Sequence, residues 1–423
     1  GLYQNMVEYN TQKNPGSLPA DFGFNPNYRE TLQKYPSLFP STPSEQAPDV
    51  IAYVDPKFKM PQVWRSNLNV DIQLPYDFML SVGAMYTRDI YNVAQINMNE
   101  AEPTGVYNEQ PDRIYWASKK YEYNDYTNGK NVVVKLSNGE DKGYQYSFNA
   151  ILTKKYDFGF TGSIGYTYTM AKDLTANPGS APNSAWQNNV AVNSLNDPGV
   201  SYSLFSTPHR IIANASYEIN YAKCLKTTFS LFYSGYHTGR YSYTYYNDMN
   251  GDGNYSDLIY VPNSQDEMTF VDITDKSGAI TYSAVDQAKD FWDFVNNDSY
   301  LKDRKGKYVE RNGSLTPWIN RFDFKIAQDF YATLGGRKYG IQVSLDMLNV
   351  GNMINSKWGA YQSCGLKSYD NVQLLKTASK VGEPLTYQIN ANSREAFKER
   401  SSWQYTNTIG SAWSMQLGVK VTF

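Results

Sequence analysis

Residues 64–74 have the sequence WRSNLNVDIQL, and this stretch determines how the rest of the chain is interpreted. Its even positions are Trp64, Ser66, Leu68, Val70, Ile72 and Leu74, whereas arginine, asparagine, aspartate and glutamine occupy its odd positions. This period of two is expected of a β-strand with one apolar and one polar face. Because a strand of about 10 residues crosses a bilayer, the stretch predicts a membrane-crossing strand whose polar face meets water.

The same alternation recurs in eight further segments, so nine strands are predicted. They are residues 64–74, 78–86, 144–152, 158–168, 211–221, 229–233, 322–326, 341–347 and 413–423. Short links at 75–77, 155–157, 222–224 and 333–336 alternate with loops of roughly 35 to 80 residues, the asymmetry of outer-membrane barrels. The sequence therefore predicts an all-β fold, a transmembrane antiparallel barrel with long extracellular loops, the largest at 241–318. A soluble all-β protein also shows alternation but has short turns at both ends.

Composition agrees with a barrel that faces both lipid and water. The 423 residues include 38 Tyr, 19 Phe and 8 Trp, yet the mean hydropathy is -0.58. No stretch approaches the roughly 20 apolar residues of a membrane-spanning helix. A net charge of -2 without long charge runs excludes a nucleic-acid-binding protein.

Two cysteines, Cys224 and Cys364, are too few for a disulfide scaffold, and their predicted places at opposite barrel ends prevent them from pairing.

An acidic turn between two predicted strands is the most specific local motif. Its oxygen ligands alternate along the sequence around two glycines, as in calcium loops. The candidate calcium ligands are Asp248, Asn250, Asp252, Asn254 and Asp257. The motif departs from an EF-hand because Ile259 stands where a bidentate glutamate is required. A hairpin turn uses the same residue types, so a calcium site and a simple turn both remain open.

The remaining motifs do not indicate catalysis. His209 and His237 lie on different strands without acidic or cysteine neighbours at metal-ligand spacing, and no nucleophile–base arrangement is present. We therefore expect no enzyme activity. In the largest loop, Ser283 is expected to cap a short helix through Asp286, with an apolar stripe formed by Val285, Ala288, Trp292 and Val295.

Several motifs, in this order along the chain, resemble one family. They are DPKFKMPQ at 55–62, VDIQL at 70–74, TPHRI at 207–211, YSYTY at 241–245, NGDG at 250–253, DLIYVP at 257–262, RNG at 311–313 before Pro317-Trp318, and LNVGN at 348–352. The chain thereby resembles Oar-like TonB-dependent receptors of the Bacteroidota and related bacteria. The resemblance covers nearly the whole chain.

The resemblance implies an outer-membrane receptor of a Gram-negative bacterium. Its relatives carry a carboxypeptidase-regulatory-like domain, a plug and a 22-stranded barrel, so residues 1–423 would be the C-terminal nine or ten strands without the plug. Expected partners are outer-membrane lipid, the remaining N-terminal barrel and plug, the TonB system and a possible surface lipoprotein. A surface structural or adhesive protein and a passive channel are the alternatives.

Two further sets of residues are predicted to contact partners. The loop segments 183–205, 241–260 and 357–398 would form a ligand vestibule, with exposed aromatic side chains that could grip a ligand or pack loop against loop. These are Trp186, Tyr245, Tyr246 and Trp358.

The apolar side of the last strand would face lipid, and its terminal aromatic resembles the sequence that the barrel-assembly machinery recognises. The residues of this assembly signal are Trp413, Met415, Leu417, Val419, Val421 and Phe423. A possible tenth strand tip is expected at residues 2–9.

Overall fold

The computed structural model describes residues 50–123, 132–364, 367–368, 371–390, 403–406 and 408–423, together with residues 19, 21–23 and 25–36. The strand tip expected at residues 2–9 lies outside these residues. No helix within the described ranges has the length and apolar character required to cross a membrane.

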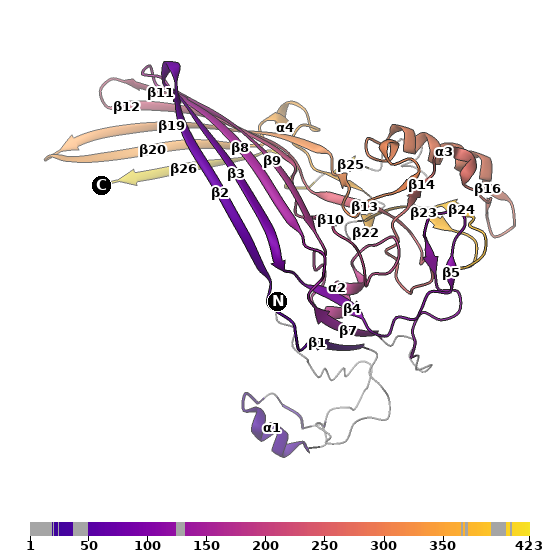
Figure 1. Ribbon diagram of the computed structural model, residues 1–423. Coiled ribbons are helices and arrows are strands. Elements are labelled where there is room, and N and C mark those ends of the chain that lie inside the picture. The colour runs from indigo at the N-terminus through magenta and orange to yellow at the C-terminus, as the bar shows by residue number, and fades with distance from the viewer. Residues whose placement is uncertain are drawn as a thin grey trace.

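All nine predicted strands are present and lie side by side in one antiparallel sheet (Figure 1). In spatial order they are β2 (Gln62–Leu74), β3 (Phe78–Tyr91), β8 (Tyr144–Lys155), β9 (Phe160–Asp173), β11 (His209–Tyr221), β12 (Leu225–His237), β19 (Trp318–Leu334), β20 (Arg337–Leu348) and β26 (Ser414–Thr422). A short tenth strand, β10 (Ser201–Tyr202), pairs with β9. Each wall strand pairs with the wall strand that precedes it in the chain. The long connections therefore all start and finish at the same end of the sheet.

The register places apolar side chains opposite one another on one face of the sheet. From β26 inward, Leu417 pairs with Leu345, Leu345 with Ile326, and Ile326 with Phe229. At the other edge, Val70 pairs with Val82. Little protein covers this face, since Leu417 is 73% exposed and Val419 66% exposed. A contiguous exposed apolar surface of this kind requires an apolar surrounding phase.

The opposite face carries paired polar groups. Lys325 donates to Asp346 across β19 and β20 at 2.7 Å, and Gln342 donates to Asp329 at 2.8 Å. Lys420 lies on this polar face as predicted, because its partner in the register is Gln342. The two faces therefore differ in chemistry over the whole sheet, which is the arrangement of a barrel wall between lipid and a watery lumen.

The links between strands alternate in length as the sequence predicts. Three residues, Pro75–Asp77, join β2 to β3, and only Gly335 and Gly336 separate β19 from β20. Both glycines have positive φ, 58° and 79°, which a two-residue hairpin of this type requires. The predicted loop 241–318 extends one residue into a wall strand, because β19 begins at Trp318. The exposed Cys224 and the buried Cys364 are both free thiols, as predicted.

The sheet is open. Among the described residues, β2 pairs only with β3 and β26 pairs only with β20, so β2 and β26 do not close on each other. Each of these outer strands therefore has one edge of backbone N–H and C=O groups that the described part of the chain does not pair. The described residues thus supply nine wall strands and the short β10, in agreement with the nine or ten expected of this chain. The total of 22 strands for a closed barrel stays a prediction.

The long connections fold together at one end of the sheet (Figure 1). Their strands form six small sheets of two to five strands. The strands are β1 (Val50–Val54), β4 (Ala94–Asn97), β5 (Gly105–Val106), β6 (Ile114–Tyr115), β7 (Val132–Ser137), β13 (Arg240–Tyr245), β14 (Tyr260–Val261), β15 (Ile273–Thr274), β16 (Ile280–Tyr282), β17 (Lys307–Tyr308), β18 (Ser314–Leu315), β21 (Gln362–Cys364), β22 (Lys367–Ser368), β23 (Asn371–Thr377), β24 (Tyr387–Ile389) and β25 (Trp403–Tyr405). We call this part of the molecule the loop assembly.

The helices are short and, apart from one, belong to the loop assembly. They are α1 (Tyr28–Lys34), α2 (Pro182–Gln187), α3 (Ala284–Asn297) and α4 (Gly351–Ile354), with 3₁₀ turns at η2 (Pro75–Asp77), η3 (Gln265–Glu267) and η4 (Leu301–Asp303). Ser283 caps α3 as predicted, because its hydroxyl oxygen accepts from the Asp286 N–H at 3.1 Å. The predicted apolar stripe is wrong in part: Val285 is 76% exposed, and the buried side chains of α3 are those of Gln287, Phe291, Phe294 and Val295.

Candidate functional site

The centre of the loop assembly is the strand β13, every residue of which is buried. It pairs with β23 in parallel and with β18 antiparallel. The Tyr245 hydroxyl accepts from Gln110 Nε2 at 2.9 Å, and the same nitrogen donates to Tyr387 at 2.9 Å. Tyr245 is therefore an internal group that joins three loops. The prediction that Tyr245 is an exposed ligand-gripping residue is wrong.

Trp186 is also buried, in a second cluster that contains Val132, Val134 and Leu195. Its indole N–H donates to Asn196 Oδ1 at 3.0 Å, so the ring is fixed between α2 and the segment after it. The two other predicted aromatic residues, Tyr246 and Trp358, are 48% and 52% exposed. Only these two have the exposure that the sequence analysis expected.

The acidic turn lies inside the loop assembly, close to its core. Backbone N–H groups of the turn donate to the side chains of the turn itself. Gly251 and Gly253 donate to the two oxygens of Asp248 at 2.7 and 2.8 Å, and Asn254 donates to Asp252 at 2.7 Å. Asn250 accepts in the same way from the Asp252 N–H at 3.0 Å. The turn is thus closed by its own hydrogen bonds.

Arg113 is the buried cation next to this turn. Its guanidinium, which has no exposed surface, approaches Asp257 Oδ1 at 3.5 Å and donates to the carbonyl oxygens of Val192 and Leu258. The Met249 N–H donates to the other oxygen of Asp257 at 3.0 Å. One arginine from a distant loop therefore holds the end of the turn against the segment before the wall strand β11.

Burial makes the ionised carboxylates of this turn unfavourable. It raises the pKa of Asp257 to about 7, with a further increase from Asp248 and an opposing decrease from Arg113. Burial, followed by repulsion from Asp257 and Asp248, raises the pKa of Asp252 well above its usual range. Burial also raises the pKa of Asp248. A divalent cation would relieve this repulsion.

The calcium site stays a prediction. Asp248, Asn250, Asp252, Asn254 and Asp257 do gather in one turn, but side-chain oxygens of four of them, Asp248, Asn250, Asp252 and Asp257, accept from backbone N–H groups. Within the described ranges, no three His, Cys, Asp or Glu side chains form a group that could hold a metal ion. Calcium binding would therefore require some of these side chains to exchange backbone partners for the ion.

We expect the loop assembly to lose stability as the pH rises from about 4 to about 7 in the presence of a chelator. The raised pKa of Asp257 means that the folded state favours the protonated carboxyl. The stabilisation is complete below the unfolded-state pKa of about 4 and is lost by about 1.4 kcal/mol per pH unit up to the folded-state pKa. The measurement is the thermal unfolding temperature of the solubilised protein at pH 5 and 7.5.

The control variant is Asp257→Asn, which should flatten this pH dependence. Calcium at neutral pH should raise the unfolding temperature of the unmutated protein and leave that of the variant unchanged. An unfolding temperature that does not change with calcium would show that the acidic motif is a turn and not a calcium site.

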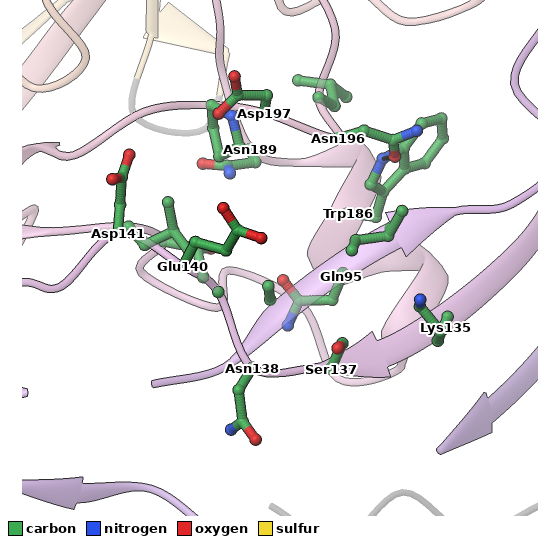
Figure 2. A pocket seen from close by; sticks show the side chains of 17 residues that line it. Gln95, Lys135, Ser137, Asn138, Glu140, Asp141, Trp186, Asn189, Asn196 and Asp197 are labelled. Atoms are coloured by element: carbon green, nitrogen blue, oxygen red, sulfur yellow. Dashed lines mark hydrogen bonds between the residues drawn. The ribbon is translucent and has the colours of Figure 1, made fainter. Parts of the chain in front are cut away.

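A pocket of about 460 Å³ opens in the loop assembly next to α2 (Figure 2). Amide and hydroxyl side chains line much of it. They come from four separate parts of the chain and include Gln95, Ser137, Asn138, Asn189 and Asn196. The acidic side chains of Glu140, Asp141 and Asp197 lie on one side of the view, whereas Trp186 and Lys135 lie on the other (Figure 2).

The charges of this pocket indicate the kind of ligand that it accepts. Lys135 already lies 3.8 Å from Asp55, so its charge is partly neutralised. Glu140, Asp141 and Asp197 are exposed at the pocket wall. An anionic ligand would be repelled, whereas a neutral polar or cationic ligand would find hydrogen-bond partners in the amides and carboxylates.

The sequence analysis identified one segment of this pocket and missed the others. The predicted vestibule segment 183–205 supplies Trp186, Asn189, Leu195, Asn196 and Asp197. Gln95, Lys135 and Glu140 were missed because they have no motif of their own. Only the pairing of β4 with β7 brings their segments together.

An open wall sheet with one apolar face, one polar face and all its long loops at one end defines a segment of an outer-membrane β-barrel. The family model described as "Outer membrane beta barrel domain" matches residues 1–358. The chain belongs to this family, which places it in the outer membrane of a Gram-negative bacterium. No curated protein and no solved structure shows significant similarity to the chain.

Proposed function

We propose that the chain forms part of the barrel wall and of the extracellular ligand vestibule of a TonB-dependent receptor of the Oar-like group. The observation that carries the proposal is the open sheet, whose edge strands β2 and β26 each have one unpaired side among the described residues. An unpaired edge in hydrocarbon costs several kcal/mol per polar group. Further strands must complete the wall, as a 22-stranded receptor would provide.

The proposal also identifies partners. An N-terminal group of strands and a plug would close and fill the barrel, and TonB would act on the plug from the periplasm. A surface lipoprotein could cover the loop assembly. These partners are supported by the ordered motifs that resemble Oar-like receptors, including TPHRI at 207–211 and NGDG at 250–253.

In this proposal the pocket beside α2 receives a polar ligand that is neutral or cationic. The loop assembly supports this role, because its buried core holds in place the loops that line the pocket. Trp186 illustrates the connection: its ring belongs to the buried cluster and also lines the pocket.

A passive channel is the alternative function, because the polar face of the sheet would also suit a water-filled pore. Ion conductance separates the two. The whole receptor in a planar bilayer should show little conductance when the plug fills the barrel, and conductance should appear when urea unfolds the plug. High conductance without urea would contradict the receptor proposal and support a channel.

The last strand provides a separate test of barrel assembly. Deletion of Phe423, which is 94% exposed, should lower the amount of receptor at the cell surface severalfold, because the assembly machinery is proposed to bind the terminal aromatic side chain. The measurement is surface labelling of whole cells. Phe423→Trp keeps an aromatic ring and should assemble normally. Unchanged surface levels after the deletion would show that Phe423 is not part of the assembly signal.

A further inference from the structure

A second pocket, of about 570 Å³, lies on the opposite side of the wall from the lumen. Its wall residues include Tyr233 of β12 and Trp318 and Phe322 of β19. In the register, Tyr233 pairs with Phe322, and the next pair on the same face is Leu231 with Phe324. The pocket therefore continues the apolar face that meets lipid. It lies where β12 ends and β19 begins, at the end of the sheet that carries the loops.

The wall side of the pocket is rigidly built. Asn320 Oδ1 accepts from the Tyr233 hydroxyl at 2.7 Å and from the Trp318 indole N–H at 2.9 Å. The rings of Tyr233 and Phe322 lie 4.9 Å apart. Gly235 lies next to the side chains of Tyr233 and Trp318, and a Cβ at this position would approach the Trp318 ring to 2.8 Å. The glycine thus leaves room for the Tyr233 and Trp318 side chains.

The loop after β20 forms the other side of the pocket. It begins with α4, where Gly351 lies close to both Phe322 and Trp358, 3.8 and 3.6 Å from the position of an added Cβ. The turn that follows is held by the Trp358 N–H, which donates to the Asn355 carbonyl at 2.9 Å. Figure 1 shows α4 at the loop end of the wall strands. This loop therefore returns over the lipid-facing side of the wall.

The loop side combines exposed apolar groups with one cation. Trp358 is 52% exposed and Tyr405 47% exposed, and both line the pocket together with the exposed Lys357. Lys357 Nζ lies 5.8 Å from the centre of the Tyr405 ring. Among the described residues, no carboxylate forms an ion pair with Lys357. Apolar rings next to an unneutralised ammonium group match the boundary between acyl chains and anionic headgroups.

We propose that this pocket binds an anionic, phosphate-bearing lipid of the outer leaflet. An acyl chain lies against Tyr233, Phe322 and Trp358, and the phosphate accepts from Lys357 Nζ. Charge complementarity favours a lipid over a second copy of the chain, since the only charged side chain among the described residues that line the pocket is the basic Lys357. The inference rests on the lipid-facing sheet and is independent of transport.

Native mass spectrometry of the whole receptor, titrated in a neutral detergent, tests the proposal. The probes are diphosphorylated lipid A, phosphatidylcholine and inorganic phosphate. We expect retention of one lipid A molecule, weaker retention of phosphatidylcholine and none of inorganic phosphate. Equal retention of lipid A and phosphatidylcholine would overturn the role of Lys357. Retention of inorganic phosphate alone would overturn the assignment to a lipid.

Two variants locate the site. Lys357→Gln should lower the affinity for lipid A by about three- to fivefold, and Trp358→Ala should lower it by about tenfold for both lipids. Lys305→Gln is the matched control, because Lys305 also lies near a tryptophan, 4.5 Å from the Trp292 ring, but outside the pocket. An unchanged affinity in both pocket variants, or an equal loss in the control, would overturn the proposal.

Discussion

Replacement of Leu417 by arginine should sharply reduce the amount of folded receptor in the outer membrane. Leu417 lies in the middle of β26, is 73% exposed and pairs with Leu345 on the apolar face. A charged side chain near the bilayer midplane costs about 2 to 4 kcal/mol. The measurement is the urea midpoint of the refolded receptor, together with its level in outer-membrane fractions.

The matched control for this substitution is the neighbouring residue. Gln416 lies on the polar face opposite Asp346, so Gln416→Arg places the same charge next to a carboxylate and water. We expect a near-normal urea midpoint for this variant. Equal decreases of the urea midpoint in the two variants would show that the two faces of β26 do not face lipid and water respectively.

Removal of the Arg113 charge should have the second largest effect. Above pH 7, where Asp257 is ionised, Arg113→Met leaves this carboxylate, 3% exposed, without its cation, and breaking a buried ion pair in this way costs about 3 to 5 kcal/mol. The carbonyl oxygens of Val192 and Leu258 also lose their donor. Limited proteolysis of the loop assembly and hydrogen exchange of β13 would report the loss.

The pH dependence distinguishes loss of the charge from loss of packing. Without Arg113, the pKa of Asp257 should rise further, so the variant should be damaged more at pH 9 than at pH 5. The double variant Arg113→Met/Asp257→Asn should recover part of the stability, and the coupling between the two positions follows from the four measurements. A loss that is equal at both pH values would mean that the methionine side chain is merely badly packed.

The wall strands could be predicted because the side chains of a strand between lipid and water alternate between apolar and polar. All nine alternating segments form wall strands, since a shift of one residue would expose every polar side chain to lipid. The loop assembly has no such constraint. The burial of Tyr245 depends on Gln110 and Tyr387, which are distant in sequence, so its exposure could not be judged from nearby residues.

The helix α3 shows the same limit on a smaller scale. The capping pair Ser283 and Asp286 was predicted because capping is local. Its buried face was predicted only in part: Val295 is buried as expected, whereas Phe291, which packs against Phe270, lies outside the predicted stripe. The acidic turn was found from its spacing, whereas Arg113 was missed because the ion pair crosses a large sequence separation.

Spin labelling of β26 in the whole receptor tests the central claim, that this sheet is a wall between lipid and water. Single nitroxide labels at Leu417, Gly418, Val419 and Lys420 would be measured in membranes for collisions with oxygen and with a water-soluble nickel complex. We predict a period of two, with Leu417 and Val419 accessible to oxygen and Gly418 and Lys420 accessible to nickel. Equal accessibility to nickel at all four positions would contradict the account.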